Sequence, residues 1–97
     1  MAKIYASSAN YVAKNTTKVI HAAPCKLRAV VLTGDGTGTV TFYDNTTATG
    51  TILMVLDVLS NQTKEILFDN LMPVVCAVGL SIITSTNARC FVITEAT

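Results

Sequence analysis

The sequence predicts an all-β domain, a small antiparallel sandwich or jelly-roll-like barrel of seven to eight strands with an extended N-terminal arm. Three observations support this prediction. Short runs of β-branched and apolar residues recur along the chain, as expected for strands. Clusters of Gly, Asp, Asn and Thr separate these runs at the spacing typical of sandwiches and small barrels. No segment carries a convincing helical period.

Residues 1–15 are expected to form the arm, and residues 16–97 the sandwich domain. The arm is rich in Ser, Ala and Asn, and its apolar residues are isolated. Such a segment either frays as a terminus or becomes ordered by docking on a neighbouring molecule. In the second case Tyr5, Tyr11 and Val12 are the candidate anchors.

The first two strands of the domain are expected at residues 16–22 and 25–33, separated by Pro24, which cannot donate a hydrogen bond to a sheet. The loop GDGTG follows the second strand. Its Asp-Gly pair suits a two-residue type I′ turn, which predicts a β-hairpin with a third strand at residues 37–43.

The hairpin fixes a register in which Val31 lies opposite Val40 on a wholly apolar face. Val30 and Leu32 then lie on the other face, where they form a candidate contact surface. The longest apolar strand is expected at residues 51–59, TILMVLDVL. Both of its faces are apolar, so the strand is either covered on both sides or exposes a face to a partner chain.

Leu53 and Val55 of this strand are therefore further candidate subunit contacts. The alternative for these two residues, as for Val30 and Leu32, is the ordinary two-sided core of a sandwich. The remaining strands are expected at residues 63–68, 74–78, 80–84 and 89–95.

The composition indicates self-association. The chain has 97 residues, of which 51% are hydrophobic and only 13% are charged, whereas globular domains average about 25% charged residues. A single domain of this size has little interior. Part of the apolar surplus must therefore lie at the surface, in contact with copies of the chain or with another partner.

Charge and hydropathy exclude several functions. The net charge is +1 and no basic stripe is present, so nucleic-acid binding is not expected. No apolar run approaches the roughly 20 residues of a membrane-spanning helix, so no membrane association is expected. The N-terminus lacks the apolar core of a secretory signal, which predicts synthesis in a cytoplasm.

No catalytic, cofactor-binding or metal-binding residues are expected. The three cysteines form no C-x-x-C pair, and they are interpreted as small buried apolar residues rather than as a Cys–His nucleophile with His21. No His-plus-carboxylate grouping supports acid–base catalysis. The isolated loop carboxylates fall short of a calcium site. The chain is therefore expected not to be an enzyme.

The run KLRAVVLTGDGTGTVTFYDNTTATGTILMVLDV, with the later GLSIITSTNARCFVITE, resembles small β-sandwich accessory proteins of tailed-bacteriophage virions. The resemblance covers residues 26–95 and includes capsid decoration, or cement, proteins. It implies a homo-oligomer, a trimer in preference to a dimer, that binds the major capsid protein on the outer capsid surface of the virion. Alternatives are a tail, head-fibre or neck component, or a carbohydrate-binding module, although the chain has no Trp and three Tyr.

Overall fold

The computed structural model describes residues 7–68 and 74–96 of the chain, and all regular structure in these ranges is β. The predicted all-β fold class is confirmed. The nine strands of the described residues are β1 (Ser7–Val12), β2 (Thr17–His21), β3 (Cys25–Gly34), β4 (Gly38–Tyr43), β5 (Ile52–Val58), β6 (Thr63–Leu67), β7 (Val74–Cys76), β8 (Leu80–Thr84) and β9 (Ala88–Ala96). Neither described range contains a helix long and apolar enough to span a membrane.

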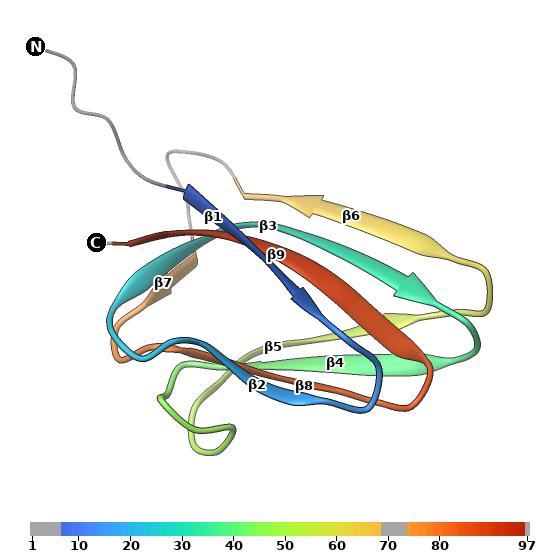
Figure 1. Cartoon of the computed structure of the whole chain (residues 1–97), viewed down its shortest axis with the longest axis horizontal. Coiled ribbons are helices and arrows are strands. Elements are labelled where there is room, and N and C mark those ends of the chain that lie inside the picture. The colour runs from blue at the N-terminus through green and yellow to red at the C-terminus, as the bar shows by residue number, and fades with distance from the viewer. Residues whose placement is uncertain (1–6, 69–73, 97) are drawn as a thin grey trace, which may run out of the picture.

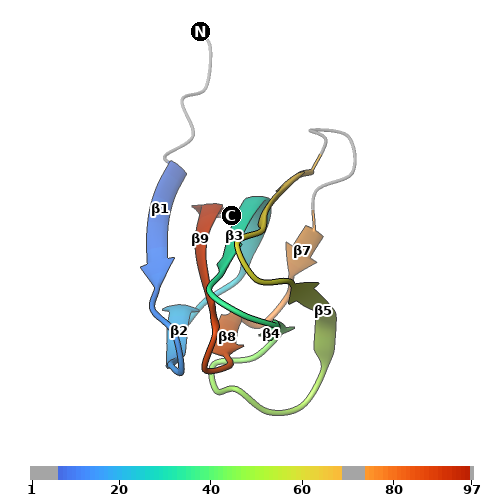
Figure 2. The same cartoon turned by 90° about the vertical axis from the view of Figure 1, so that its right-hand side faces the viewer.

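The strands form two antiparallel sheets that pack face to face as a sandwich (Figures 1 and 2). The first sheet has the order β1-β9-β3-β6, and β7 pairs with one end of β3. The second sheet has the order β2-β8-β4-β5. Strands β1 and β9, from opposite ends of the chain, lie side by side, whereas the consecutive strands β3 and β4 lie in different sheets.

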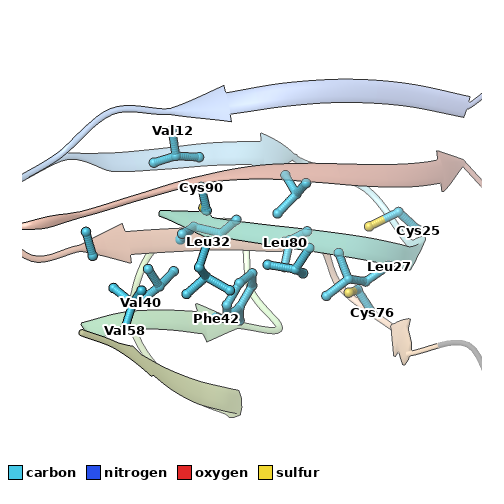
Figure 3. Close-up of a cluster of buried hydrophobic side chains, with 14 residues drawn as sticks. Val12, Cys25, Leu27, Leu32, Val40, Phe42, Val58, Cys76, Leu80 and Cys90 are labelled. Atoms are coloured by element: carbon cyan, nitrogen blue, oxygen red, sulfur yellow. The ribbon is translucent and has the colours of Figure 1, made fainter. Parts of the chain in front are cut away.

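Alternate residues of the strands fill the space between the two sheets. Figure 3 shows Leu32 of β3 and Phe42 of β4 reaching toward each other from opposite layers, and both are fully buried. The buried cluster consists of Val12, Cys25, Leu27, Val30, Leu32, Val40, Phe42, Val58, Cys76, Leu80, Ile82, Ala88, Cys90 and Val92. Removal of this apolar surface from water is the main force that holds the sheets together.

The predicted hairpin between residues 25–33 and 37–43 is wrong. Strand β3 pairs with β6, β7 and β9, whereas β4 pairs with β5 and β8. The loop between them crosses from one sheet to the other, and the backbone N–H of Asp35 donates to the carbonyl of Asn87 at 3.0 Å. A Cβ on Gly34 would lie 2.5 Å from the carbonyl oxygen of Leu59, so glycine permits a close approach there.

A bulge in β3 reverses the predicted assignment of its faces. Between Leu27 and Ala29 the register against β9 shifts, which leaves Arg28 as the extra residue. An extra residue moves the in-and-out alternation by one position. Val30 and Leu32 consequently point into the core and have no exposed area. They belong to the core of the sandwich and not to the contact surface expected from the hairpin register.

Part of the predicted arm belongs to the sandwich. Residues 1–6, which include Tyr5, lie outside the described residues. Ser7–Val12 forms the edge strand β1 and pairs with β9 along its whole length. Val12 is fully buried, so it anchors β1 to its own domain. Strand β1 also raises the number of strands from the expected seven or eight to nine in the part of the chain that the structure describes.

The carboxylate of Asp44 holds the segment between β7 and β8 against the end of β4. It accepts hydrogen bonds from the backbone N–H groups of Ala77 at 3.1 Å, Val78 at 2.9 Å and Gly79 at 3.3 Å. These bonds, led by that from Val78, lower the pKa of Asp44 because they favour its charged form.

An Asp44→Asn variant is expected to lose roughly 1–2 kcal/mol of unfolding free energy at pH 7, because a neutral amide oxygen accepts weaker hydrogen bonds. Since the pKa of Asp44 is lower in the folded chain than in the unfolded chain, this contribution is complete above the unfolded value and lost as the pH falls through the folded value. The difference between wild type and variant should thus be constant near neutral pH and shrink below about pH 4. Urea denaturation across this range measures it, and a difference unchanged in acid would contradict the assigned role.

Candidate functional site

Two neighbouring rows of side chains on the outer surface of the first sheet are almost wholly apolar. Directly opposite residues of an antiparallel pair share one face of the sheet. Across β1, β9, β3 and β6, one row is Ala9, Ile93, Ala29 and Leu67, and the next is Tyr11, Phe91, Val31 and Glu65. We call the seven apolar members of these two rows the apolar face.

Most of the apolar face is open to solvent, whereas Ala29 near its centre is only 7% exposed. Phe91 exposes 52% of its surface and Leu67 exposes 71%. The rings of Tyr11 and Phe91 pack with centroids 5.0 Å apart and an interplanar angle of 42°, within the range that aromatic pairs prefer. From strand spacing and rise, two rows across four strands cover on the order of 15 by 7 Å between Cα atoms. With its side chains, such a patch reaches the size that usually marks an interaction site on a monomer.

Charged residues flank the apolar face at both ends of the strands. At one end Lys26 lies opposite Glu95, and the Arg28 guanidinium lies 3.8 Å from the Glu95 carboxylate. At the other end the Arg89 guanidinium lies 3.6 Å from the Asp35 carboxylate. An apolar centre with a polar rim is the usual anatomy of a protein–protein interface.

The outer surface of the second sheet mixes threonine with apolar residues. Its central rows are Thr17, Ile83, Thr41 and Val55, and Val19, Ser81, Tyr43 and Ile52. Of these, Ser81 is itself buried, and its hydroxyl donates a hydrogen bond to the Asn45 carbonyl at 2.9 Å. Ile52 and Val55 each expose 53% of their surface on β5, the edge strand of this sheet. Edge strands carry backbone donors and acceptors that can pair with another chain. We call the outward side of β5, with Ile52 and Val55, the β5 edge. It is a second surface at which another chain can bind.

The structure separates the predicted contact residues. Tyr11 lies in the apolar face, whereas Val55 lies on the opposite sheet at the β5 edge. Leu53 is half-buried and packs against the core, because the register between β4 and β5 shifts at this point. The remaining four are Val12, Val30 and Leu32 in the core, and Tyr5 outside the described residues.

Phe91, Ile93 and Leu67 are members of the apolar face that the sequence interpretation missed. A signal for two of them is present in residues 89–95, RCFVITE. Both alternating sets of this strand contain apolar residues, the same feature that singled out residues 51–59. Leu67 carries no comparable signal, because its strand is short and pairs at the edge of the sheet.

The cysteine side chains are buried and carry raised pKa values. Burial raises the pKa of Cys76 and Cys90 to about 12 and also raises the pKa of Cys25, which lies opposite Cys76. Since the thiolate is the reactive form, these protonated thiols pack as small apolar groups.

The His21 Nε2 atom lies 2.6 Å from the Thr94 Oγ1 atom and so links the two sheets.

Within residues 7–68 and 74–96, no pocket is found and no three His, Cys, Asp or Glu side chains are grouped to hold a metal ion. Comparison with protein-family models, curated proteins and solved structures gives no match to this chain. The fold and the surfaces described above define the class of the protein as an antiparallel β-sandwich that exposes an apolar sheet face and an apolar edge strand.

Proposed function

We propose that this protein is a structural virion component that coats the outer surface of a phage capsid and stabilises the mature shell. The observation that carries the proposal is the pair of exposed apolar features, the apolar face and the β5 edge, on opposite sheets of one small module. The resemblance of residues 26–95 to virion accessory proteins supplies the biological setting. The chain would be made in the host cytoplasm and would bind both itself and the major capsid protein.

Two adhesive surfaces suit this role on physical grounds. A protein that binds the assembled lattice, and not the free capsid protein, shifts the equilibrium toward the mature shell by mass action. A self-associated module presents several copies of a weak shell-binding edge at once, so its overall affinity exceeds that of one edge. We assign shell contact to the β5 edge, where an extended segment of the capsid protein can add as a neighbouring strand.

Co-sedimentation with purified mature capsids of the encoding phage tests the proposal. The wild-type chain is expected to pellet with capsids and to remain in solution with unassembled major capsid protein. A Val55→Asp variant places a charge on the β5 edge and should weaken capsid binding at least 10-fold, because the charge would lose water in the contact. Val55→Ile is the matched control and should bind as wild type does.

A wild-type chain that fails to pellet with capsids would overturn the proposed function. Immunogold labelling of intact virions gives a second, independent readout, and label over the capsid shell is expected. Label confined to the tail, neck or head fibres would replace the capsid role with one of the alternative virion positions. Selective binding on a glycan array without capsid binding would favour a carbohydrate-binding module.

A further inference from the structure

We infer that the apolar face binds the same face of a second copy of this chain, about a two-fold axis that runs parallel to the strands between β9 and β3. This pairing rests on the self-association in the proposed function and specifies its face and axis, and it would occur in solution with no capsid present. A two-fold axis within the interface makes it isologous, so each contact occurs twice. The rows of the apolar face then determine which residues meet.

Rotation about this axis places β9 of one copy over β3 of the other. It keeps each residue at the same position along the strands, so each row faces the same row of the partner. Ile93 then lies over the partner's Ala29, and Phe91 lies over the partner's Val31. Packed sheets cross at about 30°, which preserves these contacts near the axis and separates the corners of the sheets. Near the axis, the larger side chains Ile93 and Phe91 therefore each meet a smaller one, the arrangement that lets facing layers interdigitate without voids.

The other two-fold axis that would align the strands runs perpendicular to them and is sterically poorer. Rotation about this second axis places β9 over the partner's β9 and reverses the position along the strand. Each row then faces the other row of the partner, so Ile93 would lie over the partner's Phe91. Ala29 would lie over the partner's Val31. Two large residues would then collide on one side of the centre while two small residues leave a gap on the other, and both faults destabilise a packed layer. The steric pattern thus selects the axis parallel to the strands.

The charges at one end of the face favour a second copy as the occupant. With the axis parallel to the strands, Glu95 lies over the partner's Lys26 and Lys26 lies over the partner's Glu95. Opposite charges across the rim suppress incorrect partners and fix the register. The face is therefore complementary to itself in size near the axis and in charge at one end, so a dimer, and not the trimer implied by the resemblance, is the expected oligomer.

Sedimentation equilibrium on the full chain tests the pairing, and the wild type is expected at twice the mass of the monomer. Phe91→Asp should remain folded by circular dichroism and raise the dimer dissociation constant by roughly 100-fold or more, because two charges would be buried without partners. Val55→Asp is the matched control, since Val55 and Phe91 have nearly equal exposure, 53% and 52%, on opposite sheets. It should remain dimeric. A monomeric or trimeric wild type, or a dimeric Phe91→Asp, overturns the inference.

Oxidative cross-linking tests the axis itself. Ile93→Cys and Ala29→Cys are made as separate variants, mixed, and treated with diamide, which takes up the two thiol hydrogens as the intermolecular disulfide forms. A cross-linked dimer is expected in the mixture and not in either variant alone. Cross-linking of Ile93→Cys by itself, or none in the mixture, rejects the axis. The capsid assay is separate, so loss of capsid binding with an intact dimer rejects only the proposed function.

Discussion

A Leu32→Asp variant is expected to be unfolded at 25 °C, whereas the neighbouring Val31→Asp variant is expected to fold. Leu32 has no exposed area and faces Phe42 in the core. Loss of a buried leucine alone costs about 2–5 kcal/mol, and an unpaired carboxylate in its place adds several kcal/mol more. That total rivals the roughly 5–15 kcal/mol that stabilise a typical domain. Val31 is half-buried on the outer face, where a carboxylate keeps contact with water.

Circular dichroism and urea denaturation distinguish the two variants. Leu32→Asp should lack the β signal and the cooperative transition, whereas Val31→Asp should retain both and should be monomeric, because it places a charge in the proposed dimer contact. A folded Leu32→Asp together with an unfolded Val31→Asp would restore the face assignment of the simple hairpin. Leu32→Met, which conserves volume, is the control and should lose less than about 1.5 kcal/mol.

The two variants differ only in which face of β3 they alter, and the sequence alone does not determine which of these faces points into the core. The alternation of residues 25–33 correctly predicts a strand, because alternation is a local property of the chain. The bulge at Arg28 is set by the pairing of β3 with β9, some sixty residues later. A one-residue shift exchanges the two faces of a strand. Since both faces of this strand are apolar, nothing local distinguishes the correct assignment from its opposite.

The GDGTG loop illustrates the same limit for topology. A type I′ hairpin needs positive φ at both central residues, but the described residues with positive φ are Asn15, Gly50 and Asn61. The loop glycines serve close packing instead, since a Cβ on Gly38 would lie 2.8 Å from the Cβ of Ala88. Gly is favoured for both purposes, and only the neighbouring chain segments decide between them.

The candidate site is predictable only in part, because its position also depends on contacts between distant parts of the chain. The surplus of apolar residues indicates an exposed apolar surface, but its location depends on which strands are neighbours. The sequence predicts Tyr11 in an extended arm, whereas the pairing of β1 with β9 places it against Phe91, from the other end of the chain. The small and polar residues of β1 give little strand signal, so this strand is defined by pairing and not by propensity.

A Phe42→Ala variant is expected to lose about 3–5 kcal/mol of unfolding free energy. Phe42 is the largest of the fully buried side chains and lies between the two sheets. Truncation removes its apolar surface from the core and leaves a cavity that the paired strands around it cannot close, because their backbones are held in the ladders of β4 with β5 and β8. Urea denaturation monitored by circular dichroism gives the unfolding free energy.

Two further variants show whether the loss arises from the cavity. Phe42→Leu keeps most of the apolar volume and should lose clearly less than Phe42→Ala, since the cost grows with the cavity left behind. Val55→Ala, on an exposed side chain of β5, should change stability by no more than about 0.5 kcal/mol. All three should be compared at one protein concentration, because dimerisation makes apparent stability depend on concentration. Equal losses for Phe42→Ala and Val55→Ala would mean that Phe42 does not bridge the sheets, and the packing of the two layers assigned here would be incorrect.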